Sequence, residues 1–136
     1  MLDHISLRVA DLDRSRKFYQ AALAPLGYSL AMEIASSGAG FRKGPIPDFW
    51  IKQGKPWKSD TAASAAELAG CGGVAIHVAF ACEDHATVDA FHRAALAAGG
   101  RDNGAPRLCP EYHPNYYGAF VLDPDGYNIE AVCHKS

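Results

Sequence analysis

The 136-residue chain contains no long hydrophobic run and no marked excess of charge of either sign. No apolar stretch approaches the roughly 18 residues that a membrane-spanning helix requires. The N-terminal segment "MLDHISLRV" also lacks the features of a signal peptide. The formal net charge is −2, and the basic residues are scattered. This argues against nucleic acid or a membrane surface as a partner. We therefore expect a soluble, cytoplasmic protein that forms a single globular unit.

Cysteine is scarce and is not spaced for a structural zinc site. The chain has 4 cysteines, none of them in a CxxC pair, and the intervals between them match no zinc ribbon. Cys82 and Cys133 lie in strand-like segments, where a free thiol behaves as a small hydrophobic side chain. We expect all of the cysteines to be reduced thiols, as is usual in the cytoplasm.

What the sequence does contain is an internal repeat. Residues 4–27 align without a gap with residues 77–100, at an offset of 73. The informative identities are His4/His77, Asp11/Asp84, Phe18/Phe91 and Gly27/Gly100. In each copy a strand-like segment precedes an aspartate suited to cap a helix. An amphipathic helix follows, and a glycine suited to a left-handed conformation closes it.

Three further strand-like segments follow in each half. We predict strands at 4–9, 28–34, 38–43 and 48–53, and again at 76–82, 101–103, 117–122 and 127–133. The turn "DPDG" separates the last two. A linker, 54–73, joins the halves and has a possible short helix at 61–69. The sequence therefore predicts an α+β fold, one domain over 1–136, in which two βαβββ modules (about 1–53 and 74–136) form a curved mixed sheet around a cleft.

Three polar side chains stand alone in otherwise apolar strands. His4 and His77 occupy the same place in the two repeats, and Glu130 is flanked by apolar residues in the last strand. A lone histidine in a strand is most often a satisfied core or edge residue, and a lone glutamate most often faces solvent. Here the histidine recurs at an equivalent place, which favours a 2-His-1-carboxylate set. Such a set binds a divalent transition metal on one face and leaves other coordination positions open.

With these features the chain resembles the vicinal oxygen chelate superfamily, which includes glyoxalase I, bleomycin resistance proteins, fosfomycin resistance transferases and extradiol dioxygenases. The resemblance covers nearly the whole chain, and the closing "DPDGYNIE" is among its more specific signals. In that family the metal ligands occupy the first and last strands of the modules. By position, the resemblance implies that His4, His77 and Glu130 bind one divalent ion: Fe, Mn, Zn or Ni. It also implies a homodimer.

The first half departs from the glyoxalase I pattern. Those enzymes use a fourth protein ligand, commonly glutamate, from the last strand of the first half. Here that strand is "PDFWIKQ" (47–53), with Trp50 near its centre and Asp48 as the nearest carboxylate. Three ligands look more like the fosfomycin resistance transferases and the extradiol dioxygenases.

Further candidate residues lie in the loop "CPEYHPNYYGAF" (109–120), which precedes the strand leading to Glu130. We predict that this loop covers the cleft and that His113 or Tyr117 supplies an acid–base group. The alternative is a surface loop whose tyrosines pack on the rim of the sheet. The predicted substrate-binding residues are Arg8, Trp50, Tyr112 and Tyr116. Arg8 could hold an anionic group or pair with a neighbouring acid. We expect His85, His92 and His134 to be solvated.

Two functions remain open at this point. The first is a mononuclear metal-dependent enzyme that chelates adjacent oxygens of a small substrate, with dioxygenase-, transferase- or lyase-like chemistry. The metal would stabilise negative charge that develops on those oxygens, and dioxygenation would require iron because zinc has no redox chemistry. The alternative is a metal-free protein of the bleomycin resistance type that sequesters a drug. Because those members generally lack the ligand set, the three ligands favour an enzyme.

Overall fold

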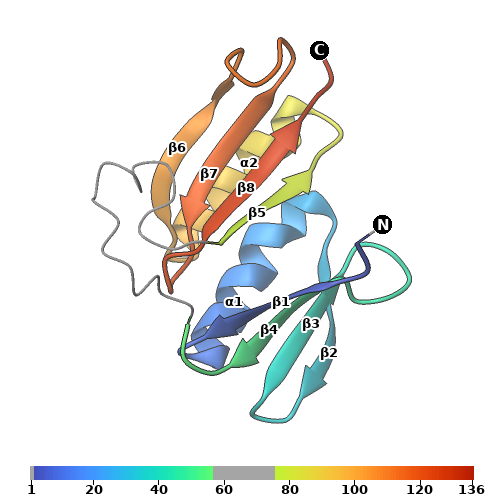
Figure 1. The fold of residues 1–136 in the computed structure, drawn as a ribbon, viewed down its shortest axis with the longest axis vertical. Coiled ribbons are helices and arrows are strands. Elements are labelled where there is room, and N and C mark those ends of the chain that lie inside the picture. The colour runs from blue at the N-terminus through green and yellow to red at the C-terminus, as the bar shows by residue number, and fades with distance from the viewer. Residues whose placement is uncertain (1, 57–75) are drawn as a thin grey trace.

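The chain folds into two similar halves, each made of one helix and four strands (Figure 1). The computed structural model describes residues 2–56 and 76–136. The first half contains β1 (Ile5–Val9), α1 (Leu12–Leu23), the 3-10 turn η1 (Ala24–Leu26), β2 (Ser29–Ile34), β3 (Gly38–Arg42) and β4 (Phe49–Gln53). The second contains β5 (His77–Ala81), α2 (His85–Ala97), β6 (Arg101–Leu108), β7 (Tyr117–Leu122) and β8 (Asn128–Cys133).

The two halves have the same sheet topology. The strand orders are β1-β4-β3-β2 and β5-β8-β7-β6. In both sheets the first and last strands of the module pair in parallel, and the remaining pairs are antiparallel. The predicted α+β fold of two βαβββ modules is thereby confirmed. Among the described residues, no helix is long and apolar enough to cross a membrane.

Both helices begin where the repeat predicts. The side chain of Asp11 accepts a hydrogen bond from the backbone N–H of Arg14, and Asp84 accepts one from Thr87. Each bond satisfies a donor that the first helical turn leaves free. The predicted ends are less uniform. Gly27 adopts the expected positive φ of 84°, but in the second half the positive φ falls on Gly99, at 96°.

Gly100 serves a packing role in place of the predicted turn role. A Cβ atom on Gly100 would lie 2.6 Å from Cγ1 of Val121. The absence of a side chain there lets the end of α2 approach β7 closely. The repeat therefore predicted a glycine requirement correctly and its physical reason incorrectly.

β6 is longer than the predicted strand at 101–103, since it reaches Leu108. It contains Gly104 and Pro106, which weaken a central strand but are tolerated at a sheet edge. β6 is such an edge strand, and its pairing with β7 shifts register on both sides of Gly104. The predicted helix at 61–69 lies outside the described residues.

Aromatic side chains join the two halves through a common core. Phe80 on β5 packs edge-on against Tyr28 and Phe49 of the first half, with ring centroids 5.2 and 5.3 Å apart. α1 and α2 also pack against each other. Because these contacts remove large apolar surfaces from water, they stabilise the packing of the two halves.

Polar side chains tie the "DPDG" turn of the second half to the first. The hydroxyl of Tyr19 donates to Asp123 at 2.6 Å, and that of Tyr127 donates to the carbonyl of Arg8 at 2.7 Å. Asp125 forms an ion pair with Arg14 at 3.1 Å. The turn that leads into β8 is therefore fixed relative to β1 and α1.

Candidate metal centre

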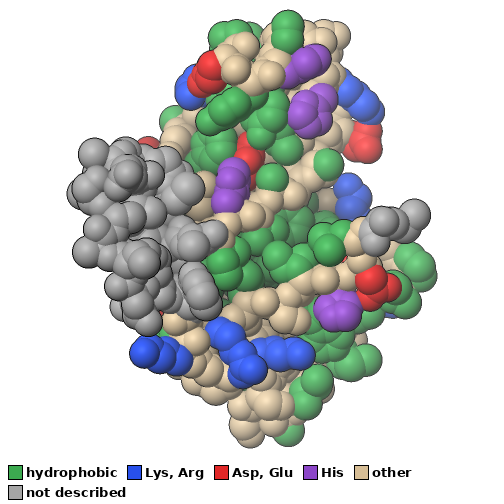
Figure 2. Space-filling model, viewed as in Figure 1, with side chains coloured by type: hydrophobic (Ala, Val, Ile, Leu, Met, Phe, Trp, Pro, Cys, Tyr) green, Lys and Arg blue, Asp and Glu red, His purple; other side chains and the backbone are tan. Residues whose placement is uncertain are grey.

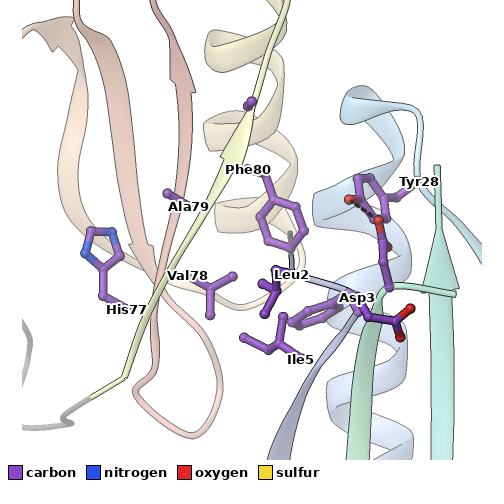
Figure 3. A pocket seen from close by; sticks show the side chains of 11 residues that line it. Leu2, Asp3, Ile5, Tyr28, His77, Val78, Ala79 and Phe80 are labelled. Atoms are coloured by element: carbon purple, nitrogen blue, oxygen red, sulfur yellow. Dashed lines mark hydrogen bonds between the residues drawn. The ribbon is translucent and has the colours of Figure 1, made fainter. Parts of the chain in front are cut away.

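The second half brings His77 and Glu130 together. Glu130 on β8 lies in register with Ala79 on β5, and alternate strand residues share a face, so Glu130 and His77 project to the same side. Nε2 of His77 lies 2.8 Å from Oε2 of Glu130. Figure 3 shows the His77 ring on the side of β5 opposite to Val78 and Phe80.

The environments of these two side chains differ. The Glu130 side chain is only 1% exposed, whereas that of His77 is 41% exposed. In the part of the chain that the structure describes, no lysine or arginine forms an ion pair with Glu130. A buried carboxylate is costly unless it is paired or binds a metal. The site therefore holds an acid that an external cation would stabilise.

The spacing of the two donor atoms suits a transition metal. Ligands at about 2.1 Å from a metal ion and at right angles to each other are about 3 Å apart. The observed separation of 2.8 Å between Nε2 and Oε2 is close to this value. Imidazole and carboxylate also match the preferences of Fe, Mn, Zn and Ni. The two residues therefore fit a metal ion as two of its ligands.

Tyr116 is the second partner of Glu130. Its hydroxyl donates to Oε1 of Glu130 at 2.6 Å, while Oε2 faces His77. Burial raises the pKa of Tyr116, and the hydrogen bond to Glu130 and its charge raise it further. The phenol therefore stays protonated and remains a donor over the physiological pH range.

The first half contributes His4, which immediately precedes β1. The side chain is 53% exposed, and its Nδ1 lies 2.6 Å from Oδ1 of Asp3. A carboxylate on one ring nitrogen leaves the other, Nε2, available to a metal, as in many histidine ligands. His4 lines a hollow of about 300 Å³ together with Ser6, Ile34, Pro47, Trp50 and Lys52.

Trp50 occupies the place in the first half that Glu130 occupies in the second. Ser6 pairs with Trp50, and Ala79 pairs with Glu130; Ser6 and Ala79 correspond through the repeat. The Trp50 ring lies directly on Gly40, where a Cβ atom would be 2.8 Å from the ring. An aromatic surface thus stands where a fourth ligand would be expected.

Asp48, the carboxylate nearest in sequence to Trp50, forms a hydrogen bond with Tyr28. Oδ2 of Asp48 accepts a hydrogen bond from the hydroxyl of Tyr28 at 3.2 Å, drawn in Figure 3. Burial and the neighbouring Asp48 raise the pKa of Tyr28 to about 12. Both side chains line a hollow of about 360 Å³ between β5 and the start of β1, which residues 77–81 also line. Asp48 therefore does not replace the missing fourth ligand.

One chain does not bring all three predicted ligands together. Within residues 2–56 and 76–136, no three His, Cys, Asp or Glu side chains are placed to hold one metal ion. His77 and Glu130 share the second sheet, whereas His4 belongs to the first half. Figure 2 shows histidine side chains over both halves on this face of the molecule. Each half thus carries an incomplete set of ligands.

The remaining predicted residues divide into those near Glu130 and those away from it. Tyr112 is exposed, and its ring centroid lies 5.1 Å from that of Tyr116. Nδ1 of His113 accepts a hydrogen bond from the backbone N–H of Asn115 at 3.2 Å. Arg8 donates to the carbonyl of Gln53 at 3.3 Å. None of these three contacts Glu130 directly.

Tyr117 lies on the opposite face of the second sheet. Its hydroxyl donates to Asp89 on α2 at 2.9 Å, and its ring stacks on His85 at 4.0 Å. Phe120, which is in register with Glu130, faces the site, and a residue three positions away on the same strand points the other way. The structure therefore separates Tyr117 from His77 and Glu130.

Two features were missed by sequence reasoning. His92, predicted to be solvated, is only 9% exposed, and its Nε2 lies 2.9 Å from Oδ1 of Asp102. Gly118, not singled out in the sequence, lies beside Glu130: a Cβ atom there would be 3.0 Å from Oε1. The antiparallel register of β7 and β8 would have placed Gly118 near the acid, but that register cannot be read from residue types alone.

The fold and the site define a class of proteins: duplicated α+β proteins with two βαβββ modules, which here carry His4 and His77 at equivalent positions. The family model described as the Glyoxalase/Bleomycin resistance protein/Dioxygenase superfamily matches residues 1–131. The chain belongs to this superfamily, and the predicted resemblance is confirmed. Members commonly bind a divalent metal and act on or bind small molecules.

Solved structures support the same assignment. A glyoxalase/bleomycin resistance protein from Albidiferax ferrireducens T118 is 28% identical, with 96% of each chain covered and a TM-score of 0.72. A family enzyme from Burkholderia phytofirmans PsJN is 17% identical, with 98% of each chain covered and a TM-score of 0.69. The second likeness shows the fold alone. No curated protein matches the chain significantly.

Proposed function

We propose that the protein is a divalent-metal-dependent enzyme that binds a small substrate through two adjacent oxygens. His4, His77 and Glu130 are the metal ligands. The observation that supports this most directly is the 2.8 Å pair of His77 Nε2 and Glu130 Oε2, in which the carboxylate is buried and has no lysine or arginine partner among the described residues. The bound metal would supply Lewis-acid stabilisation of negative charge on the substrate oxygens.

We propose further that the site is completed in a homodimer. His4 lies in one half and the His77–Glu130 pair in the other, and one chain does not unite them within its described residues. In a twofold dimer the first half of each copy can face the second half of its partner, which creates two equivalent sites. Each site would contain His4 from one protomer and His77 with Glu130 from the other.

The residues around the ligands suit a substrate with a flat, apolar part. The Trp50 ring rests on Gly40 and forms one wall of the hollow beside His4. Phe120 lies in register with Glu130 on the other sheet, and its ring centroid is 6.0 Å from that of His77. Arg8 and Tyr112 remain the proposed polar contacts at the margins, and His113 is the proposed acid–base group. Aromatic walls with a few polar groups are typical of small-molecule sites.

Position 50 carries a tryptophan and not a carboxylate, and this limits the kinds of reaction that the site supports. Three protein ligands leave more positions open for substrate oxygens than four do. This supports dioxygenase-, transferase- or lyase-like chemistry over that of a four-ligand glyoxalase I. The metal would be Fe for dioxygenation, and Mn, Zn or Ni would serve Lewis-acid reactions. We place this activity in the cytoplasm, consistent with the free thiols of Cys82, Cys109 and Cys133.

Metal analysis of the purified, untagged protein tests the proposed function. We expect near one equivalent of a divalent transition metal per chain, and a large loss in His4→Ala and in His77→Ala. Absence of metal from the wild type after reconstitution with Fe, Mn, Zn and Ni in turn would overturn the enzyme proposal. It would favour sequestration of a small molecule instead.

Complementation between two variants tests whether the site is shared. We expect His4→Ala and Glu130→Ala to bind no metal separately. After subunit exchange in an equal mixture, a mixed dimer carries one intact site, so about one quarter of an equivalent per chain should return. A site built within one chain would not be restored by mixing. Persistent absence of metal in a mixture with demonstrated subunit exchange would exclude the shared site.

A further inference from the structure

We infer that Tyr116 is a positioning residue that occupies one oxygen of Glu130, so that the carboxylate binds the metal through its other oxygen alone. The inference rests on the proposed function, because it concerns the same site. It assigns Tyr116 a role different from the substrate contact that the sequence predicts. Three features of the site support this role: the two oxygens of Glu130, Gly118, and the loop that presents Tyr116.

The two carboxylate oxygens have different partners. Oε1 accepts the hydroxyl proton of Tyr116 at 2.6 Å, and Oε2 lies 2.8 Å from His77 Nε2. Short hydrogen bonds to an ionised acceptor are about twice as strong as neutral ones. With Oε1 engaged in such a bond, Oε2 is the oxygen left beside the imidazole. A metal held with His77 therefore meets one oxygen of Glu130.

Gly118 makes the contact between Tyr116 and Glu130 possible. A Cβ atom at residue 118 would lie 3.0 Å from Oε1 of Glu130 and 3.2 Å from Cε1 of Tyr116. Both distances are shorter than ordinary van der Waals contact, so a side chain at residue 118 would require the carboxylate and the phenol to shift by a few tenths of an ångström. Gly118 is not one of the described glycines whose φ is positive. Its absence of a side chain thus serves this contact and not a turn.

The loop before β7 holds the Tyr116 backbone in place. The N–H of Tyr116 donates to the carbonyl of His113 at 2.9 Å, and its carbonyl accepts from the N–H of Cys109 at 2.7 Å. The ring packs edge-on against Tyr112 and His134, with centroids 5.1 Å away in each case. The phenol is therefore fixed on both sides before any metal or substrate binds.

The consequence for coordination is one additional open position. A carboxylate bound through both oxygens would occupy two positions, whereas one held through Oε2 occupies one. With His4 and His77, three positions would be filled on an ion that takes six ligands, and three would remain. Two of these can take adjacent oxygens of a substrate, and the third stays free. Tyr116 thus influences how many substrate atoms the site can accept.

The affinity and spectrum of bound Co(II) test this role. We expect Tyr116→Phe to weaken Co(II) binding by about 10- to 100-fold, as for other residues that orient a metal ligand. Its visible absorption should also change, because Glu130 is free to bind through both oxygens. Gly118→Ala should have the same two effects. Tyr117→Phe is the matched control: it removes a similar 2.9 Å tyrosine–carboxylate bond on the opposite face of the same strand, and it should leave both measurements unchanged.

The possible outcomes separate the two proposals. Binding of Co(II) by the wild type, with affinity and spectrum unchanged in Tyr116→Phe, would overturn the positioning role and leave the metal site intact. An equal loss of affinity in Tyr116→Phe and Tyr117→Phe, without a spectral change, would also overturn it, because that pattern reports a general loss of stability. No binding by the folded wild type, with thermal unfolding as the check, would overturn the metal site and the positioning role together.

Discussion

Glu130 is a carboxylate with 1% exposure in the middle of a strand whose neighbours are apolar. Such a group stabilises the folded chain poorly without a cation, because burial removes the water that solvates its charge. Its two partners, His77 and Tyr116, offset part of this cost through hydrogen bonds. The position is therefore better explained by metal binding than by stability.

At the residue scale, Glu130→Gln should separate these two roles. Glutamine keeps an acceptor for Tyr116 but removes the charge, so we expect metal binding to be lost. The metal-free variant should unfold at the same temperature as the metal-free wild type or at a higher one. Metal content and thermal unfolding of the metal-free proteins measure the two effects. Retention of a full equivalent of metal would remove Glu130 from the ligand set.

The strand alternation shows how much of the site the sequence could predict. It places His77 on the same face of β5 as Ala79, but only the register of β5 and β8 in the structure puts Glu130 on that face, in contact with His77. Strand patterns cannot predict the Tyr116 bond, because it depends on the backbone path of the loop after Cys109. They also cannot unite His4 with the pair, since that requires the arrangement of the two halves.

At the element scale, the repeat predicts the starts of both helices well, because an N-cap is a local interaction. Strand ends depend on partners far away in sequence, and β6 accordingly extends beyond its predicted end. Gly99 and Gly100, at the end of α2, are a further case in which local sequence is not sufficient. Their separate roles depend on Val121, which comes from another strand.

The contact between β3 and β4 gives a prediction at this scale. Gly40→Ala would place a Cβ atom 2.8 Å from the Trp50 ring, so the ring must move off the sheet. We expect a loss of about 1–3 kcal/mol in the free energy of unfolding, as for other overpacked sites. Gly44→Ala is the control, because nothing lies within 4 Å of its Cβ position. Urea denaturation measures the free energy of unfolding of both variants. Equal values for Gly40→Ala and Gly44→Ala would show that the packing of the Trp50 ring does not require a glycine at position 40.

At the scale of the whole molecule, Asp123 links the second half to Tyr19 on α1. Burial raises the pKa of Asp123, even though its hydrogen bonds with Tyr19, Tyr127 and Asp125 act in the opposite direction. An acid with a raised pKa favours the folded state most when it is protonated. Its stabilising contribution is complete below the pKa of the unfolded chain, about 3.9. It is lost as the pH rises through the higher pKa of the folded state.

We therefore expect Asp123→Asn to change the pH dependence of stability. Asparagine cannot ionise, so the stability of the variant relative to the wild type should increase as the pH rises from about 4 through the raised pKa of Asp123 in the folded state. Urea denaturation of the variant and the wild type, measured side by side at several pH values, gives this difference. The wild type at each pH is the control for the variant. A relative stability that falls with rising pH would show that the folded protein favours the ionised carboxylate.

The presence of Trp50 where the repeat would place an acid has a consequence for the substrate. In the proposed dimer, each site has an indole on one side and a carboxylate on the other. The two ends of a substrate, even when chemically identical, would meet different surroundings. A substrate with two identical oxygen-bearing ends would then bind with one end beside the indole and the other beside the carboxylate, so its two ends would differ in reactivity. Duplication of a module, followed by one change from acid to indole, is sufficient to make the two ends of a pseudosymmetric site inequivalent.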